Sequence, residues 1–222
     1  MPLMASPRGR GAALEELRRG GIVPVIRAES AGVAVRVVEA LVAGGIRTLE
    51  ITMTVPDAAG AIRAVADRFG QDVLLGAGTV TSRPLAEQAL AAGAEFLVTP
   101  CLVAEVIAVA RERDVAVLPG ALTPTEVFTA WSAGGDIVKI FPASNVGGAS
   151  YLRALKGPFP QIPLCPTGGV TLQTIGELVK AGADAVGVGG ELVSKAAIAK
   201  GDYDAIAALA ARYVTALSDA RA

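Results

Sequence analysis

Short apolar runs recur along the chain at intervals of roughly 20 to 25 residues, and each interval is long enough for one crossover helix. Four runs follow a segment of small residues with a helix-ending glycine, namely Gly44, Gly93, Gly134 or Gly182. Glycine suits the left-handed residue that ends a helix, and an apolar run after it is typical of a buried strand. The pattern predicts eight strands, which fall within residues 22–26, 44–52, 73–75, 93–99, 115–118, 134–141, 162–165 and 182–188.

Helix-start signals occupy the segments between these runs. Ser82, Thr123 and Thr171 each precede a helical pattern, and a proline follows near the first two, so all three are predicted N-caps. Eight alternations of strand and helix predict an α/β fold whose parallel sheet closes on itself, the (β/α)8 or TIM barrel. A doubly wound open sheet is the alternative, but eight units with short loops fit the usual size of the barrel. Residues 1–20 are predicted to form an N-terminal extension and helix.

Composition places this barrel in one domain. The chain has 222 residues, of which 52% are hydrophobic and 18% charged, and this is enough apolar material for one large core. Proline and glycine are spread along the chain rather than pooled in a linker, so residues 1–222 are predicted to form a single domain. A formal net charge of −1 and 4% aromatic residues argue against nucleic acid as a partner.

The sequence has no pattern typical of secretion, of a membrane span or of a disulfide framework. The first 19 residues carry charges and Pro7 where a secretion signal needs an unbroken apolar stretch. Nowhere do about 18 apolar residues run together without a charge, so no membrane span is predicted. The sequence predicts a soluble cytoplasmic protein. Cys101 and Cys165 do not imply a disulfide framework, and both are expected to be reduced residues that only pack.

The chain contains no histidine, which removes the commonest general base, the Ser–His dyad and every His-based zinc site. Proton transfer must therefore use Glu, Asp, Lys, Tyr or Cys. Four of the five lysines lie near helix ends, where solvated charges are expected: Lys156, Lys180, Lys195 and Lys200.

The fifth lysine, Lys139, lies inside the sixth apolar run between Val138 and Ile140. The two-residue period of a strand sends those apolar neighbours toward the helices and Lys139 into the barrel. Burial favours a neutral amine, the nucleophile that forms an imine with a ketone, although a buried ion pair is an equal alternative for Lys139 alone. The second run favours the nucleophile, because its alternation points Glu50 inward with Thr48 and Thr52, and strands two and six lie opposite each other.

Glycine-rich loops follow the last two strands, at residues 166–171 and 187–190. Phosphate sites in this fold are often built from backbone amides at these two places. Glycine is also routine in turns, so each loop alone is a weak signal and the pair is stronger. Arg27 closes the first strand and could add a cation to the same rim.

With Glu50, Lys139 and the two glycine loops in this order, residues 21–193 resemble the family of 2-keto-3-deoxy-6-phosphogluconate (KDPG) and 4-hydroxy-2-oxoglutarate (KHG) aldolases. The segments that carry the resemblance are VPVIR (23–27), LEIT (49–52), GAGTV (76–80), TP (99–100), LPG (118–120), KIFPA (139–143), KGPFP (156–160) and PTGGV (166–170). The resemblance implies that Lys139 is the Schiff-base lysine and Glu50 the proton-transferring glutamate. The residues assigned to substrate binding are Arg27, Thr52, Thr54, Thr79, Pro100, Phe141, Thr167, Gly168, Gly169, Gly189 and Gly190.

Within that set, Thr79 matches a contact to the pyruvyl carboxylate, whereas Pro100 and Phe141 match residues that wall the keto acid. Two departures concern the substrate ends. Several family members have an arginine four residues after the glutamate, where this chain has Thr54. In the last loop a serine often follows the glycine, whereas this chain continues with Gly190 and then Glu191, which is expected to point away at the start of the final helical segment.

The resemblance implies a class I aldolase that cleaves KDPG to pyruvate and glyceraldehyde 3-phosphate, and KHG to pyruvate and glyoxylate. It implies no metal and no organic cofactor, and it implies a homotrimer. Alternatives are an aldolase for another 2-keto-3-deoxy sugar acid, such as the 6-phosphogalactonate, and a barrel sugar-phosphate isomerase or epimerase. The isomerase would share the glycine loops but would not need a nucleophilic lysine in strand six. A catalytically silent binding protein would not need to keep both Glu50 and Lys139.

Overall fold

The computed structural model describes residues 8–222, so the first seven residues of the predicted N-terminal extension lie outside the described part. The strands are β1 (Ile22–Ile26), β2 (Thr48–Thr52), β3 (Leu74–Gly78), β4 (Phe96–Val98), β5 (Ala116–Leu118), β6 (Gly120–Ala121), β7 (Val138–Ile140), β8 (Leu164–Pro166) and β9 (Val186–Val188). The α-helices are α1 (Arg10–Gly20), α2 (Ala31–Ala43), α3 (Ala58–Phe69), α4 (Arg83–Ala92), α5 (Ala104–Glu112), α6 (Pro124–Ser132), α7 (Ala149–Lys156), α8 (Ile175–Lys180), α9 (Lys195–Lys200) and α10 (Tyr203–Arg221). Short 3-10 turns lie at Gly70–Asp72 and Ala143–Val146. Within residues 8–222, no helix is both long and apolar enough to cross a membrane.

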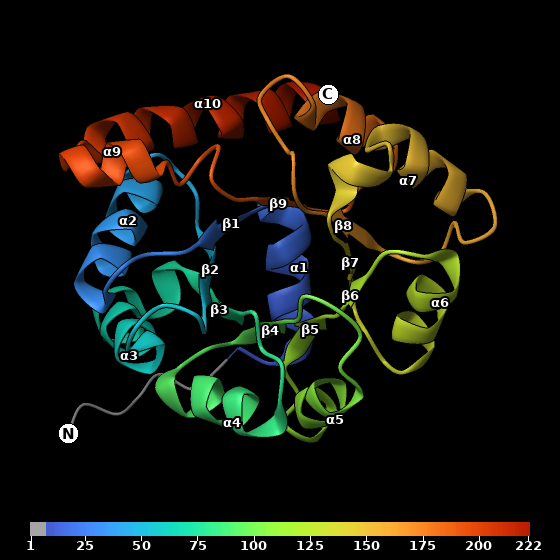
Figure 1. The fold of residues 1–222 in the computed structure, drawn as a ribbon, viewed down its shortest axis with the longest axis horizontal. Coiled ribbons are helices and arrows are strands. Elements are labelled where there is room, and N and C mark those ends of the chain that lie inside the picture. Colours follow the sequence, from blue (N-terminus) through green and yellow to red (C-terminus); the bar gives the residue numbers. More distant parts are fainter. Residues whose placement is uncertain (1–7) are drawn as a thin grey trace.

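The strands form a parallel ring with α2 to α10 around it and α1 across one of its openings (Figure 1). Hydrogen bonds join them in the orders β5-β4-β3-β2-β1-β9 and β6-β7-β8. The chain itself connects β5 to β6 through Pro119, and a bridge between Thr167 and Gly187 connects the ends of β8 and β9. These two junctions close the sheet, so the predicted (β/α)8 barrel is confirmed.

The fifth strand runs beyond its predicted range, 115–118, and is interrupted in the structure. Its two parts, β5 and β6, lie on either side of Pro119, which has no N–H to donate to a neighbouring strand. Thr99 bridges the break, because its amide donates to Leu118 O and its hydroxyl accepts from the amide of Gly120 at 3.0 Å. These two bonds of Thr99 keep the ring of strands continuous across the break.

Two of the three predicted N-caps are confirmed. The Ser82 and Thr123 side chains each accept a hydrogen bond from the amide three residues later. The prediction for Thr171 was wrong, because α8 begins only at Ile175. The hydroxyl of Thr171 instead accepts from the amide of Thr174 at 3.2 Å, in a turn that precedes the helix.

Apolar side chains fill the lower half of the ring, on the side of the strand amino ends. Helix α1 covers this opening and inserts Ala13 and Leu17. The Phe96 ring lies so close to the backbone that a β-carbon at Gly76 would come within 2.3 Å of it. The strands add to this inner cluster Val23, Leu74, Phe96, Val98, Ala116, Leu118, Ile137, Cys165 and Ala185. With this end packed, polar side chains inside the ring gather toward the opposite end.

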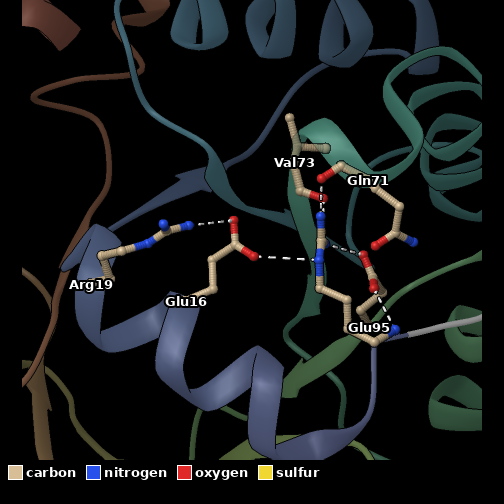
Figure 2. Close-up of polar contacts among 6 residues, drawn as sticks. Glu16, Arg19, Gln71, Val73 and Glu95 are labelled. Atoms are coloured by element: carbon tan, nitrogen blue, oxygen red, sulfur yellow. Dashed lines mark hydrogen bonds and ion pairs between the residues drawn. The ribbon is translucent and has the colours of Figure 1, made fainter.

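Ion pairs fix α1 and the chain before it to the bottom of the barrel. The Asp136 carboxylate, buried just before β7, accepts from Arg10, from Arg111 at 2.6 Å and from the amide of Val117 at 2.8 Å. Arg8 bonds to Glu95 and to the carbonyls of Gln71 and Val73 (Figure 2). These bonds tie the N-terminal helix to the strands that carry the site.

Replacing Asp136 by Asn keeps the shape of the side chain but removes the charge that Arg10 and Arg111 face. We expect the free energy of unfolding to fall by about 2 kcal/mol, below the usual cost of breaking a buried pair because both arginines are partly exposed to water. Equilibrium urea unfolding measures the change. Asp67→Asn, at an exposed position on α3, is the control and should change stability by less than about 0.5 kcal/mol. Equal midpoints for the two variants would contradict the anchoring role.

Candidate active site

Lys139 lies at the centre of β7 with its side chain inside the ring. It is 5% exposed, whereas Val138 and Ile140 are fully buried in the outer core against the helices. The inward side of the same segment also carries Ile137, which belongs to the inner cluster. Strand alternation therefore directs the amine toward the barrel axis, as the sequence pattern predicts.

Glu50, at the centre of β2, reaches the same point from the opposite wall. Its Oε1 lies 4.0 Å from the Lys139 Nζ, and the residue is 2% exposed. Gly78 on the neighbouring strand makes room for it, because a β-carbon there would lie 1.7 Å from Oε1. A glycine in that position is thus a condition for the carboxyl to point at the amine.

The electrostatics of Glu50 are dominated by its removal from water. Burial raises the pKa of its carboxyl above the ordinary value, and the positive charges of Lys139 and Arg27 lower it only in part. Its Oε1 has no hydrogen-bond partner among residues 8–222. A carboxyl with a raised pKa can both take up and return a proton closer to neutral pH than an ordinary glutamate does.

Thr52, Thr54 and Arg27 lie above this pair, at the carboxyl ends of β1 and β2. The buried Thr52 hydroxyl is 3.2 Å from the Ile26 carbonyl and 2.8 Å from the Thr54 hydroxyl. Thr54 and Arg27 are exposed at the rim. The arrangement offers two hydroxyls and one cation on the Glu50 side of the mouth.

Thr79, Pro100 and Phe141 follow the ends of β3, β4 and β7. The Phe141 ring centre lies 5.5 Å from the Lys139 Nζ, within the range of a cation–π contact. Thr79 has a φ of 56°, a left-handed conformation that is strained for a β-branched residue. Such strain concentrates at functional sites, where neighbouring structure holds it. Pro100 packs its backbone against Gly120, at the broken strand.

The two glycine loops meet at the end of the barrel where β8 and β9 finish. The Thr167–Gly187 bridge brings them side by side, and Gly168 and Gly169 have φ values of 91° and 73°. Gly189 and Gly190 have open space where a β-carbon would be. Backbone amides in such loops are suitable anion ligands.

Glu191 occupies the turn before α9 rather than a helix, because α9 begins at Lys195. Its side chain is exposed. The expected helical start at this position was therefore wrong.

Three residues near the site were given no part in it by the sequence interpretation, which had Thr99 only within a segment of the family resemblance and Cys165 only as a packing residue. Ser144 lies against Gly169, and its amide donates to the Gly168 carbonyl at 3.2 Å, so it supports that loop. Thr99 is fully buried at the broken strand. Cys165 faces Lys139 across the β7–β8 pair, and burial raises the pKa of its thiol to about 12. Ser144 and Thr99 both follow strand ends, which was the available signal.

The other expectations concern the cysteines, the lysines near helix ends and metal ions. Both cysteines are free, with Cys101 exposed and Cys165 buried. The expectation of solvation was wrong for Lys156, whose amine donates to the Ile162 carbonyl at 2.8 Å and lies 3.5 Å from Asp184. Over residues 8–222, no group of three or more His, Cys, Asp or Glu side chains could hold a metal ion.

Replacing Lys139 by Met removes the positive charge and keeps a long flexible side chain. The pKa of Glu50 should rise further, because that charge now opposes the effect of burial. Titration of ¹³C-labelled glutamate carboxyls by NMR measures the change, with Glu50→Gln identifying the signal. Lys195→Met, at an exposed position on α9, should leave the titration as it is. A lower pKa in the Lys139 variant would contradict this account of the pair.

Comparison with known proteins agrees with the geometry. A family model described as KDPG and KHG aldolase matches residues 14–209. The 2-dehydro-3-deoxy-phosphogluconate aldolase of Dickeya dadantii is 40% identical over 87% of this chain and 91% of its own. The KHG/KDPG aldolase of Escherichia coli is 37% identical over the same shares of the two chains.

Among solved structures, KDPG aldolase from Legionella pneumophila, with pyruvate captured as a covalent carbinolamine intermediate, superposes with a TM-score of 0.82. The two share 31% sequence identity, and the match covers 90% of this chain and 96% of that one. These relatives match over most of their length, and the Legionella structure has the fold found here. The chain therefore belongs to the KDPG and KHG aldolase family of lyases.

Proposed function

We propose that this protein is a class I aldolase that uses Lys139 to cleave KDPG into pyruvate and glyceraldehyde 3-phosphate, and KHG into pyruvate and glyoxylate. The observation that carries the proposal is the buried Lys139–Glu50 pair, with 4.0 Å between amine nitrogen and carboxyl oxygen. The names of the relatives support the substrates, and the carbinolamine in the Legionella structure supports covalent chemistry.

In the first half of the reaction, Lys139 supplies the covalent bond. Its Nζ attacks C2 of the keto acid, and loss of water leaves an iminium. The Glu50 carboxylate then removes the proton of the C4 hydroxyl. The C3–C4 bond breaks, its electron pair moves to the iminium to give an enamine, and the aldehyde departs.

In the second half, Glu50 returns its proton to C3, which becomes the methyl carbon of pyruvate. Water hydrolyses the iminium, which frees pyruvate and restores the amine. One carboxyl acts first as base and then as acid, and its raised pKa suits both tasks. The chemistry needs no metal and no organic cofactor.

Substrate binding is assigned around this pair. Thr79 contacts the pyruvyl carboxylate, and Pro100 and Phe141 wall the keto acid. With Thr54 in place of the arginine found in several family members, we assign the nearby positive charge to Arg27. Its effect on the pKa of Glu50 supports this assignment, since the charge must lie within electrostatic reach of the site.

The distal phosphate is assigned to the two loops at the ends of β8 and β9. Thr167, Gly168 and Gly169 supply one side, and Gly189 and Gly190 supply the other. The left-handed backbone of Gly168 and Gly169 supports this assignment, because such a backbone can present amides to an anion, and Ser144 braces the loop. An aldolase for the 6-phosphogalactonate acid would also use Lys139 and Glu50. Steady-state assays of both phosphorylated acids distinguish these two enzymes.

The domain limits, the oligomeric state and the cellular location complete the proposal. We propose that residues 1–222 act as one domain, since the two apolar clusters among residues 8–222, one inside and one outside the ring, are built on the same strands. The homotrimer and the cytoplasmic location stay predictions from family resemblance and sequence.

Borohydride added with pyruvate should attach a reduced pyruvyl group to the peptide that contains Lys139. That amine is buried beside the site, whereas Lys180, Lys195 and Lys200 lie at helix ends. Peptide mass spectrometry locates the label. Lys139→Arg should abolish labelling and turnover without unfolding the protein, because arginine stays charged and cannot form an imine. A label on any other lysine would contradict the assignment.

Glu50→Gln is the matched variant for the same experiment. It keeps the size of the side chain, so the trapped adduct should still form, although more slowly. Exchange of the pyruvate methyl protons with deuterated water should fall by about 100-fold or more, the scale for losing a positioned acid or base. Exchange at the wild-type rate would assign the proton to another group.

If the two glycine loops bind phosphate, KDPG should have a kcat/KM well above that of its unphosphorylated analogue and of KHG. The contribution of a remote phosphate appears in kcat, in KM or in both. Steady-state assays of the three substrates and of the 6-phosphogalactonate acid measure it. Equal values for all of them would mean that the Gly190 and Glu191 departures have removed phosphate recognition.

A further inference from the structure

A second cavity lies at the opposite end of the barrel from Lys139 and Glu50. Its volume is about 700 Å³, and it is bounded by the end of α1, the start of β2 and the end of α10. This size lies in the range of small-molecule sites. The residues that line it are Glu16, Arg19, Gly20, Ile22, Gly45, Ile46, Arg47, Thr48, Val214, Leu217, Ser218, Arg221 and Ala222.

The charged side chains of this cavity are mostly positive. Three arginines, Arg19, Arg47 and Arg221, line it with only one acidic side chain, that of Glu16. Glu16 is shared, because it lies 3.7 Å from Arg19 and 3.4 Å from Arg8 (Figure 2). Within residues 8–222, Arg47 and Arg221 form no ion pair. Arg47 and Arg221 therefore line the cavity without an acidic side chain of the described residues paired to them.

Arg221 is held in place rather than free in solvent. Its guanidinium donates to the carbonyls of Arg18 at 2.7 Å and Arg19 at 2.8 Å, at the end of α1. Two bonds fix the planar group, and an arginine has five N–H donors in total. A guanidinium fixed in this way can bind an anion with little further ordering.

The inner wall of the cavity is closed. Thr48 lies behind this wall and is 1% exposed, and its hydroxyl has neither a hydrogen-bond partner within residues 8–222 nor surface open to the cavity. Gly20 covers the hydroxyl, since a β-carbon there would lie 2.7 Å from it. Beside it, Ile22, Ile46 and Leu217 supply an apolar floor.

We propose that this cavity binds a small organic carboxylate with an apolar body. The carboxylate would meet Arg47 and Arg221, and the body would lie on the apolar floor. The site is separate from the aldolase chemistry, since it lies at the amino ends of the strands and shares none of the residues assigned to catalysis.

Benzoate is the probe, and benzamide is its uncharged counterpart of the same shape. Titrations followed by ligand-observed NMR, with saturating pyruvate present to occupy the catalytic site, give both dissociation constants. Benzoate should bind saturably and at least about tenfold more tightly than benzamide, because charge-assisted hydrogen bonds are the stronger ones. Absence of saturable binding, displacement by pyruvate or equal binding of benzamide would each overturn the proposal.

Two variants locate the binding. Arg47→Gln should raise the Kd of benzoate by about threefold to tenfold, the effect of losing one such bond. Arg212→Gln, on α10 but outside the cavity lining, should leave it unchanged. Unaltered affinity in Arg47→Gln would overturn the proposal, and so would equal losses in Arg47→Gln and Arg212→Gln.

Discussion

An amine and a carboxyl, both buried and 4.0 Å apart, are the constraint on which the rest of this barrel depends. The distance is too long for a hydrogen bond, so the pair gains charge attraction without the directional bond that would offset its removal from water. The raised pKa of Glu50 is the result. The surrounding structure must hold both groups in place, because they do not hold each other.

The lower half of the barrel provides that support. Phe96 and the side chains around it leave no space beneath the pair, and α1 covers them from below. Asp136, three residues before Lys139, joins α1, α5 and β5 through charged hydrogen bonds. Rigid packing at the amino ends of the strands thus allows open loops at their carboxyl ends, the usual division of roles in this fold.

Sequence patterns predict the features of this barrel that repeat along the chain, namely the strands and the side of each strand that faces inward. Apolar runs and glycines place the strands, and alternation points Lys139 and Glu50 inward, so barrel geometry alone makes them meet. The late start of α8 comes from a local turn in which the Thr171 hydroxyl accepts from the Thr174 amide, and the residue types alone do not distinguish this turn from an N-cap. The link across the break at Pro119 depends on Thr99, 21 positions from Gly120, and no local pattern contains it. The same holds for Asp136, whose partner Arg10 is 126 positions away. Lys156 looked solvated because its partner, Asp184, belongs to another unit.

The glycines of the mouth differ in how freely they can change. Gly78 cannot acquire a side chain while Glu50 keeps its position, because the new atom would occupy the same space. Gly189 and Gly190 border empty space and have no left-handed backbone, so a residue such as serine fits there without moving any neighbour. If the last loop binds the substrate phosphate as proposed, a single codon change there adds a hydroxyl to the binding site and leaves Lys139 and Glu50 where they are.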